Sequence, residues 1–435
     1  MKESASGNSF LKRPETQRIM NALYGDPSDS TSLPINRFKK LTNRFVKIFN
    51  KEADQYFSAP GRIEIGGNHT DHNHGRILAA ATQLDAIGLA SVISEPEIVI
   101  HSEGFDEPFH VKLTEKMSPQ KAYEGTTTAL IQGIVARFQE LGYQTGGFQA
   151  VVSSQVFAGS GLSSSASIEL LIASILNGLY NNNKIDAVTL AKICQYSENV
   201  FFNKPCGLMD QLISAVGGIA AIDFRHPESP DIRQVKFDFN DYRYQLFVVS
   251  TGGDHAKLID DYAAIPEEMK SVAHYFGGTV CRDISLSQLM DNIKTLRTKT
   301  GDRAVLRAYH FLTENQRVLD QVDALSNHDL KGFLSLVNDS GNSSAQWLQN
   351  VFAPHQVAVQ GVTLALALTT AYIRKIGEGA CRVHGGGFAG TILAFIPDAH
   401  GSDYRHDMEK VFGQQSVLKL SVRPYGALHL NATAV

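Results

Sequence analysis

The sequence predicts an α+β protein built as two domains. Its 435 residues, 43% of them hydrophobic, are enough for a large core and two domains. Helix and strand signals are interleaved along the chain. The clearest helix begins at Ile168, where apolar residues recur at helical spacing, and the clearest strand is the alternating run Tyr244–Ser250.

The first elements follow a polar N-terminal extension. Residues 1–35 are rich in Ser, Asn and Pro, and we expect a flexible, loosely held segment with one short helix at Thr16–Leu23. The next expected elements are a helix at Arg37–Asn50, a strand at 58–67 broken by glycines, and strands at Ala86–Val92 and Ile98–His101.

The middle of the chain is predicted to be mainly helical. Helices are expected at Thr126–Leu141, after the serine-rich turn, at Ala187–Phe201, and from Cys206–Gln211 onward. We place the domain boundary near Pro227–Asp231, giving an N-terminal domain at 36–230 and a C-terminal domain at 231–435. The latter is expected to contain a helix at Ala304–Leu325 and strands at Tyr244–Ser250, Cys381–Val383 and Gly390–Ile396.

Composition restricts the classes of partner. The net charge of −4 and the isoelectric point near 6.4 argue against nucleic acid or an anionic membrane as the main partner. No apolar segment resembles a secretory signal or spans a bilayer. The four cysteines are far apart and form no CxxC pair, which is typical of reduced thiols in the cytoplasm. We therefore expect a cytoplasmic protein.

A turn rich in glycine and serine, residues 159–165, precedes the helix that contains Ile168. At a helix N-terminus, unpaired N–H groups and the positive end of the helix dipole face outward. Glycines let the backbone close around an anion, and hydroxyls add donors and a metal ligand, so phosphate is the natural guest. The alternative is a simple N-cap, but three consecutive serines exceed what one cap needs.

A second glycine run, residues 385–390, formally matches the dinucleotide-binding pattern Gly-x-Gly-x-x-Gly. The strand-like stretch 391–396 follows it, whereas a dinucleotide site requires a helix there. The sequence therefore argues against a Rossmann-type site at this run.

A further polar turn, residues 68–74, places three histidines beside Asp71. A metal site is one reading. The pattern His-x-x-His in a loop lacks the i, i+4 geometry of a helix, however, and no cysteine is near. We favour a polar turn whose imidazoles bond to the backbone or a ligand. Taken singly, Arg62 fits a surface arginine, Asp210 fits a carboxylate favoured at a helix start, and Glu198 fits a solvated helix residue.

Together these segments resemble the galactokinases of the GHMP kinase superfamily. The motifs, in family order, are Ala59-Pro60-Gly61-Arg62, Asn68-His69-Thr70-Asp71, Gly159-Ser160-Gly161-Leu162-Ser163-Ser164-Ser165-Ala166-Ser167, Pro205-Cys206-Gly207-Leu208-Met209-Asp210-Gln211 and Gly385-Gly386-Gly387-Phe388. The segment 314–318 also resembles the family's C-terminal domain, and the similarity extends from about Arg37 to Thr391. The resemblance implies a two-domain GHMP kinase fold with the active site in the cleft between the domains.

The resemblance also implies an activity, namely transfer of the ATP γ-phosphoryl group to the 1-hydroxyl of galactose, with Mg²⁺ as cofactor. It makes Asp210 the catalytic carboxylate, with Arg62 beside it, and Ser165 and Glu198 the magnesium ligands. The implied sugar contacts are Asn68, His69, Asp71, Gly207 and Tyr262, and the implied nucleotide-binding residues are Gly159, Ser160, Gly161, Leu162, Ser163, Ser164 and Ser165. The expected partners are a small-molecule sugar and ATP, and the expected oligomeric state is a monomer.

Three departures from the family pattern bear on specificity. Asn68 and His72 replace a glutamate and a tyrosine, and the adenine-side tryptophan is missing from residues 126–129. The family glutamate holds the sugar 6-hydroxyl. A hydrogen bond to a charged acceptor is worth about 1.5–3 kcal/mol and a neutral one about 0.5–1.5 kcal/mol. The exchange could therefore cost about tenfold in affinity for that hydroxyl, or shift the choice of sugar.

Two other functions remain open at the level of sequence. One is a related sugar 1-kinase with shifted specificity, for example for N-acetylgalactosamine. The other is a sugar-sensing regulator that does not catalyse, as in fungal galactose sensors that have lost residues of the serine loop. Here residues 163–167 are complete, and Arg62 and Asp210 are present, which favours an enzyme.

The kinase interpretation depends on one spatial expectation. Asp210, Arg62 and the turn 159–165 must meet at one site, although they are far apart in the chain. An arginine within about 4–6 Å should lower the pKa of Asp210 by about 1–3.

Overall fold

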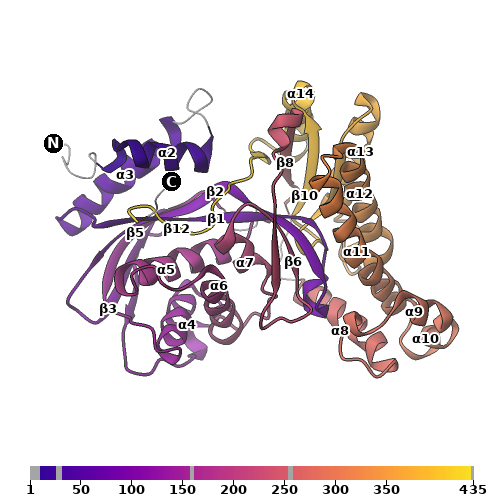
Figure 1. Cartoon of the computed structure of the whole chain (residues 1–435), viewed down its shortest axis with the longest axis horizontal. Coiled ribbons are helices and arrows are strands. Elements are labelled where there is room, and N and C mark those ends of the chain that lie inside the picture. Colours follow the sequence, from indigo (N-terminus) through magenta and orange to yellow (C-terminus); the bar gives the residue numbers. More distant parts are fainter. Residues whose placement is uncertain (1–9, 26–31, 157–160, 253–257, 433–435) are drawn as a thin grey trace.

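Two β-sheets, each covered by helices, lie side by side (Figure 1). The computed structural model describes residues 10–25, 32–156, 161–252 and 258–432. The first part of the chain contains α2 (Pro14–Tyr24), α3 (Ser32–Phe49), β1 (Gln55–Gly66), η2 (Asp71–Asn73), β2 (Arg76–Val92), β3 (Glu97–Ser102), β4 (Phe109–Lys112), α4 (Thr127–Glu140), β5 (Phe148–Ser154), α5 (Ser164–Tyr180), α6 (Ala187–Tyr196), η4 (Ser197–Phe201), α7 (Met209–Val216), β6 (Ile219–Asp223) and β7 (Asp231–Val235).

The remainder begins with the central strand of the second sheet. Its elements are β8 (Tyr244–Ser250), α8 (Ile259–Tyr275), α9 (Leu286–Asp291), α10 (Ile293–Lys299), α11 (Asp302–Ser326), α12 (Leu330–Ser343), η8 (Ser344–Leu348), α13 (Gly361–Ile376), β9 (Ala380–His384), β10 (Thr391–Pro397), α14 (Asp398–Phe412), β11 (Val417–Leu420) and β12 (Leu428–His429). None of the helices in the described ranges has the length and apolar character needed to cross a bilayer.

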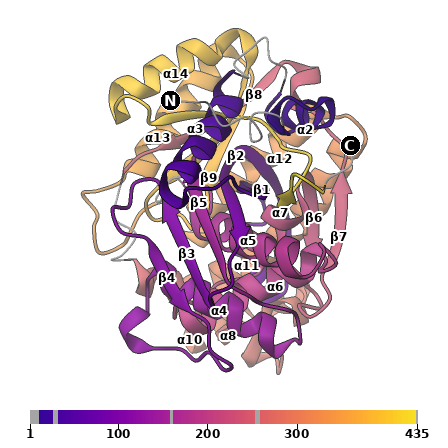
Figure 2. The same cartoon turned by 90° about the vertical axis from the view of Figure 1, so that its left-hand side faces the viewer.

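The first sheet runs in the order β12-β1-β2-β5-β3-β4, and a branch of β6 and β7 extends from β2. Its pairings are antiparallel except for β3 with β5. In the view of Figure 2, β3 and β4 lie toward one edge and β6 and β7 toward the other. Helices α4–α7 cover one face, and α2 and α3 cover the opposite face (Figure 1).

The described part of the N-terminal extension is packed rather than loosely held, which corrects our expectation for residues 10–25. Ile19, Met20 and Leu23 of α2 are almost completely buried, together with Phe38 and Phe45 of α3. Helical spacing brings these apolar residues onto one face of each helix, although the segment is polar on average. Residues 1–9 and 26–31 lie outside the described residues.

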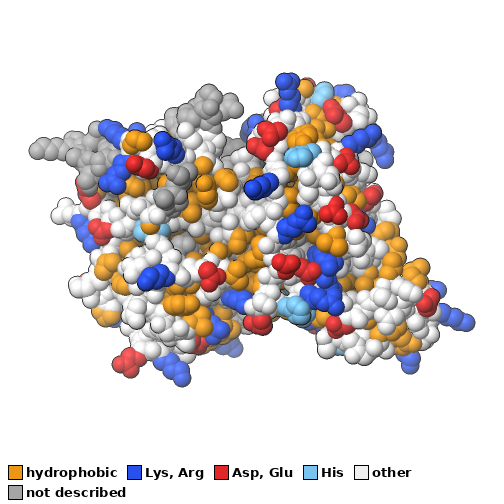
Figure 3. Space-filling view, in the orientation of Figure 1, with side chains coloured by type: hydrophobic (Ala, Val, Ile, Leu, Met, Phe, Trp, Pro, Cys, Tyr) orange, Lys and Arg blue, Asp and Glu red, His pale blue; other side chains and the backbone are white. Residues whose placement is uncertain are grey.

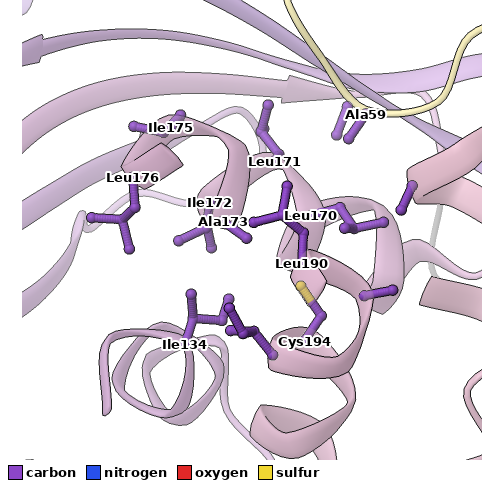
Figure 4. Packing of buried hydrophobic residues seen from close by; sticks show 14 of the residues in the cluster. Ala59, Ile134, Leu170, Leu171, Ile172, Ala173, Ile175, Leu176, Leu190 and Cys194 are labelled. Carbon is purple, nitrogen blue, oxygen red and sulfur yellow. The ribbon is translucent and has the colours of Figure 1, made fainter. Parts of the chain in front are cut away.

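The helix after the serine-rich turn is the centre of the first core. Buried α5 residues include the run 170–176, and Ile134 of α4 and Leu190 and Cys194 of α6 point toward this run (Figure 4). We predicted that only one face of this helix is buried, and this prediction is wrong. The helix lies between the sheet and other helices, so it is buried on more than one side.

Strands β1 and β2 connect the two halves. Phe57 and Ala59 of β1 belong to the core beneath the first sheet, whereas Ile63 and Ile65 belong to a second core shared with β8, β10, α11 and α12. The pairing of β1 with β2 shifts register between Pro60 and Arg62 and again between Glu64 and Gly66. The strand is therefore irregular where the two halves meet.

The second sheet is antiparallel, in the order β11-β8-β10-β9. The strands β7 and β12, which the predicted boundary at residue 230 assigns to the C-terminal domain, pair instead with β6 and β1 of the first sheet. The chain thus leaves the first sheet after β7 and returns to it at its C-terminal end.

On the face seen in Figure 3, acidic and basic side chains are interspersed.

Candidate active site

Arg62 is positioned by the irregular part of β1. A register shift re-aims a side chain relative to a regular strand, and Arg62 lies directly after one. Gly61 allows close approach, since a Cβ there would lie 2.8 Å from the carbonyl oxygen of Leu162. The Arg62 amide donates to the same carbonyl over 3.0 Å. Strand β1 is therefore docked on the turn that precedes α5.

The turn before α5 uses left-handed backbone at two described positions. Gly161 has φ of +73°, and Ser163 has φ of +59°, which is uncommon for a residue with a side chain. Ser163 makes no side-chain cap on α5, and its hydroxyl donates instead to Oδ2 of Asp210. This serine therefore points into the site and does not serve the capping role that the sequence left open. Gly159 and Ser160 lie outside the described residues.

Asp210 is the second residue of α7, and it lies against Arg62. Arg62 donates to Oδ1 of Asp210 through Nε and Nη2, both at 2.8 Å, and donates through Nη1 to the carbonyl of Gly161. Burial would raise the pKa of Asp210, but the charge of Arg62 and the bond from Ser163 outweigh it and hold that pKa below its usual value. The Asp210 side chain is 32% exposed, so an ionised carboxylate remains accessible.

Ser165 and Glu198 lie together beside this carboxylate. Ser165 is in the first turn of α5, and its hydroxyl donates to Oε1 of Glu198 over 3.2 Å. Glu198 belongs to η4, a π-helical turn of the kind often found at functional sites. Its Oε2 accepts from Gln211 over 2.7 Å, and its Oε1 from Lys204 over 2.9 Å.

These oxygens fit a magnesium ion. Two neighbouring ligands of an octahedral ion with bonds of about 2.0–2.1 Å lie about 3 Å apart, close to the 3.2 Å between Ser165 Oγ and Glu198 Oε1. Mg²⁺ commonly takes one or two carboxylates and completes its shell with water and phosphate oxygens. Within the described residues there is no group of three or more His, Cys, Asp or Glu side chains suited to hold a metal.

Three turns meet near the start of α7. A Cβ on Gly207 would lie only 1.8 Å from Oδ2 of Asp71, so a larger residue there would displace the Asp71 carboxylate from the segment before α7. His69 Nε2 lies 2.9 Å from the carbonyl of Gly386, and the Tyr262 hydroxyl donates to the carbonyl of Gly387 over 3.0 Å. The polar turn, the α7 motif and the glycine turn between β9 and β10 therefore converge.

Burial keeps the imidazole of His69, in the polar turn, uncharged. Burial, reinforced by His72, lowers the pKa of His69 to about 3, so its ring is neutral at physiological pH. Its contact with Gly386 is the backbone bond expected for a polar turn.

The side chain of Asn68 makes its hydrogen bonds with other residues of the protein. Its side-chain amide donates to Oε1 of Glu64 and to the carbonyl of Gly385, both over 2.8 Å, and its Oδ1 accepts from Asn350 over 2.8 Å. The residue is completely buried. Both amide hydrogens are therefore used in linking β1 to the glycine turn, and contact with a sugar hydroxyl would require these bonds to change. Sugar contact by Asn68 stays a prediction.

Sequence reasoning missed several polar residues around the site. Glu64 and Arg382 form a buried ion pair at 2.9 Å, and each stands between apolar residues of a strand, which is a usable signal for a buried charge. Glu169 accepts from Gln211, which also bonds to Glu198. Lys204 has no such signal, because nothing in the spacing relates it to its partner.

Comparison with known families matches both halves of this site. A family model described as "Galactokinase galactose-binding signature" matches residues 43–92, the region of Arg62 and Asp71. A second, described as "GHMP kinases N terminal domain", matches residues 129–218, the region of the serine turn, Glu198 and Asp210. These two regions contain Arg62, Asp71, Glu198 and Asp210, whereas Tyr262 and the glycine turn between β9 and β10 lie outside them.

Comparison with whole proteins covers most of the chain. A galactokinase of Mannheimia succiniciproducens is 29% identical over 84% of this chain and 90% of its own length. A galactokinase of Streptomyces coelicolor is 28% identical over 83% of this chain and 89% of its own length. The structure of Lactococcus lactis galactokinase complexed with galactose superposes with a TM-score of 0.75 at 22% identity, covering 89% of this chain and 98% of that one. Methanococcus jannaschii mevalonate kinase has a TM-score of 0.59 at 14% identity, covering 84% of this chain and 98% of that one.

Proposed function

Because the chain belongs to the galactokinases of the GHMP kinase superfamily, we propose that it transfers the γ-phosphoryl group of ATP to the 1-hydroxyl of galactose. The products are galactose 1-phosphate and ADP. The observation that supports this most strongly is the cluster of Asp210, Arg62 and Ser163, in which an ionised carboxylate with an accessible side chain faces the turn before α5.

Asp210 orients the acceptor hydroxyl and takes its proton. Because Arg62 and Ser163 keep the pKa of Asp210 low, this carboxylate is a weak base. Proton transfer therefore follows after the bond to the γ-phosphorus has begun to form, when the hydroxyl has become acidic. Phosphoryl transfer depends chiefly on positioning and charge stabilisation, which suits such a base.

Arg62 supplies fixed positive charge to the transferred group. Its side chain is 7% exposed and is bonded to Asp210 and to the carbonyl of Gly161. A guanidinium held in this way needs no reorganisation as charge develops on the phosphoryl oxygens. The serine turn binds the other phosphates through backbone N–H groups at the start of α5.

Ser165 and Glu198 would hold Mg²⁺, which neutralises charge on the phosphate oxygens when it is bound. Ser165 is positioned by α5, which packs on β1 and β2, and Glu198 by η4, which packs against α4 and α6. The polar turn with His69 and Asp71, together with Gly207 and Tyr262, binds the sugar. We also propose that the protein is cytoplasmic, since all four cysteines are free thiols, and that it is a monomer.

An assay of ADP release over a panel of sugars tests the proposal. Galactose, 6-deoxygalactose, N-acetylgalactosamine and glucose are compared with and without Mg²⁺, and the product is identified by phosphorus NMR. We expect galactose to be phosphorylated at its 1-hydroxyl only when Mg²⁺ is present. A clear preference for N-acetylgalactosamine would instead indicate the related sugar kinase, and sugar binding without turnover would indicate a sensor.

A further inference from the structure

The loop between η4 and α7 carries a lysine whose side chain pairs with Glu198, a proposed magnesium ligand. The ammonium of Lys204 lies 2.9 Å from Oε1 of Glu198. The Lys204 side chain is 60% exposed, whereas that of Glu198 is 4% exposed. The charge of Lys204 also acts on Asp210 and Tyr262. One exposed cation therefore faces the groups assigned to metal, acceptor and sugar.

The backbone of this loop is anchored, so that the lysine can change partner only through its side chain. The Lys204 amide donates to the carbonyl of Glu198 over 3.1 Å, and the Cys206 amide donates to Oδ1 of Asn199 over 2.7 Å. Pro205 follows the lysine and restricts the chain further. The lysine side chain itself is a flexible four-carbon stem with an ammonium at its end.

Lys204 binds the oxygen that a metal would need. Ser165 and Lys204 both contact Oε1 of Glu198, and the pair of Ser165 and Glu198 is the one that fits Mg²⁺. An ammonium and a divalent ion on the same oxygen would repel each other strongly at such short range. Binding of the metal therefore requires the ammonium to leave Oε1.

We propose that Lys204 is an exchangeable counter-ion, which neutralises Glu198 in the free protein and contacts a phosphate oxygen of the nucleotide once metal is bound. The proposal rests on the proposed function. The nucleotide brings a compact source of negative charge beside the lysine, and an ammonium is a good partner for phosphate. Arg62 cannot perform this exchange, because it is nearly buried and is held by both Asp210 and Gly161.

The two parts of the proposal predict changes of opposite sign in a neutral variant. In Lys204→Met, Mn²⁺ alone should bind about two- to fivefold more tightly, because its competitor is gone. ATP in the presence of Mg²⁺ should bind about tenfold more weakly, because a charge-assisted hydrogen bond to phosphate is lost. A purely structural role for Lys204 would weaken both.

Electron paramagnetic resonance measures binding of Mn²⁺ without nucleotide, and equilibrium dialysis measures binding of ATP with Mg²⁺. Lys204→Gln serves as a second neutral variant, and Lys204→Arg should keep both affinities close to those of the unmodified protein. Lys192→Met is the matched control, since Lys192 pairs with Glu228 at 3.7 Å on the surface. It should change neither affinity. Thermal unfolding checks that each variant is folded.

Opposite shifts in both neutral variants support the exchange. The proposal is overturned if Mn²⁺ affinity does not rise, or if ATP affinity does not fall, in the folded variants. Neither measurement depends on which sugar is the acceptor. If the unmodified protein does not bind ATP with Mg²⁺, both the proposed function and this proposal are overturned. If it does bind ATP with Mg²⁺ but the affinities of the Lys204 variants are unchanged, only this proposal is overturned.

Discussion

Two polar centres of this molecule are each built around an aspartate, and they differ in how many partners the carboxylate has. Asp85, on β2, has no exposed side-chain surface and is bonded by Tyr24, Ser58, Arg37 and Arg423. Asp210 has two side-chain partners, Arg62 and Ser163, and is 32% exposed. In both cases burial raises the carboxyl pKa, and the neighbouring charges lower it further than burial raises it.

The difference separates the structural use of Asp85 from the chemical use that we propose for Asp210. Asp85 joins α2, α3, β1 and the segment before β12, so its partners come from both ends of the chain and leave it no free acceptor. Asp210 is held by Arg62 and Ser163, and part of its surface stays open, as the proposed contact with a substrate hydroxyl requires. Arginine pairing therefore closes off the carboxylate at one centre, whereas at the other it leaves the carboxylate accessible for the proposed reaction.

The largest expected effect is on turnover in Asp210→Asn. The amide cannot accept the proton of the acceptor hydroxyl, so kcat should fall by about 10²- to 10⁴-fold. Steady-state assays of ADP release measure this, and calorimetry should still detect galactose. Asp106→Asn, at an exposed position, is the control. Turnover close to that of the control would remove Asp210 from the mechanism.

The matching change at the structural centre, Asp85→Asn, should act on stability instead. Removing the carboxylate leaves the buried Arg423 without its charged partner, which costs about 3–5 kcal/mol of unfolding free energy. Urea unfolding measures this loss, and kcat per folded molecule should be retained. A large loss of kcat with unchanged stability would contradict the division between the two centres.

A third test concerns the buried amide of Asn68, in the polar turn. In Asn68→Glu a second carboxylate would face Glu64, whose only ion-pair partner among the described residues is Arg382. We expect a loss of about 2–3 kcal/mol in unfolding free energy. The double variant Glu64→Asn and Asn68→Glu keeps one carboxylate and one amide in contact. It should recover most of the lost unfolding free energy. A double variant no more stable than the single one would show that the pairing does not matter.

The smallest effect is the acid response of the structural centre. Because the pKa of Asp85 is lower in the folded protein than its ordinary value of 3.8, its contribution to stability is complete above that pH and is lost as the pH falls further. The stability gap between the unmodified protein and Asp85→Asn should be constant from pH 7 to about 4 and then narrow, by at most about 1.4 kcal/mol per pH unit. Urea midpoints between pH 6 and 3 measure this gap. A gap that widens in acid would show that the carboxylate is not stabilised by folding.

Local patterns in the sequence predicted helices α2 to α7 and α11 and the strands β8, β9 and β10 of the second sheet, but not β11 or the bounds of the other helices. The expected helix Thr126–Leu141 is α4, at Thr127–Glu140, and the expected strand Tyr244–Ser250 is β8 with the same bounds. Only the last part of β2 was predicted, because its first half contains Ala79, Ala80 and Ala81, which carry little strand signal. Periodicity alone does not show that a strand reaches across two sheets.

In the site, residues within local motifs could be predicted, whereas contacts between distant parts of the chain could not. Motifs around Arg62 and Asp210 could be recognised, and the structure brings the two side chains into contact. The partners of Asn68 could not be predicted, since Asn350 and Gly385 are about three hundred residues away and belong to the second half. The resemblance implies a sugar contact at Asn68, which stays a prediction, and the structure adds that its amide joins the two halves.

A crystal structure with galactose, Mg²⁺ and a non-hydrolysable ATP analogue tests the central claim most directly. The account predicts the 1-hydroxyl of galactose within hydrogen-bond distance of the Asp210 carboxylate, with the γ-phosphate between that hydroxyl and Arg62. A sugar bound with its 1-hydroxyl turned away from Asp210, or a nucleotide bound far from the turn before α5, would contradict it.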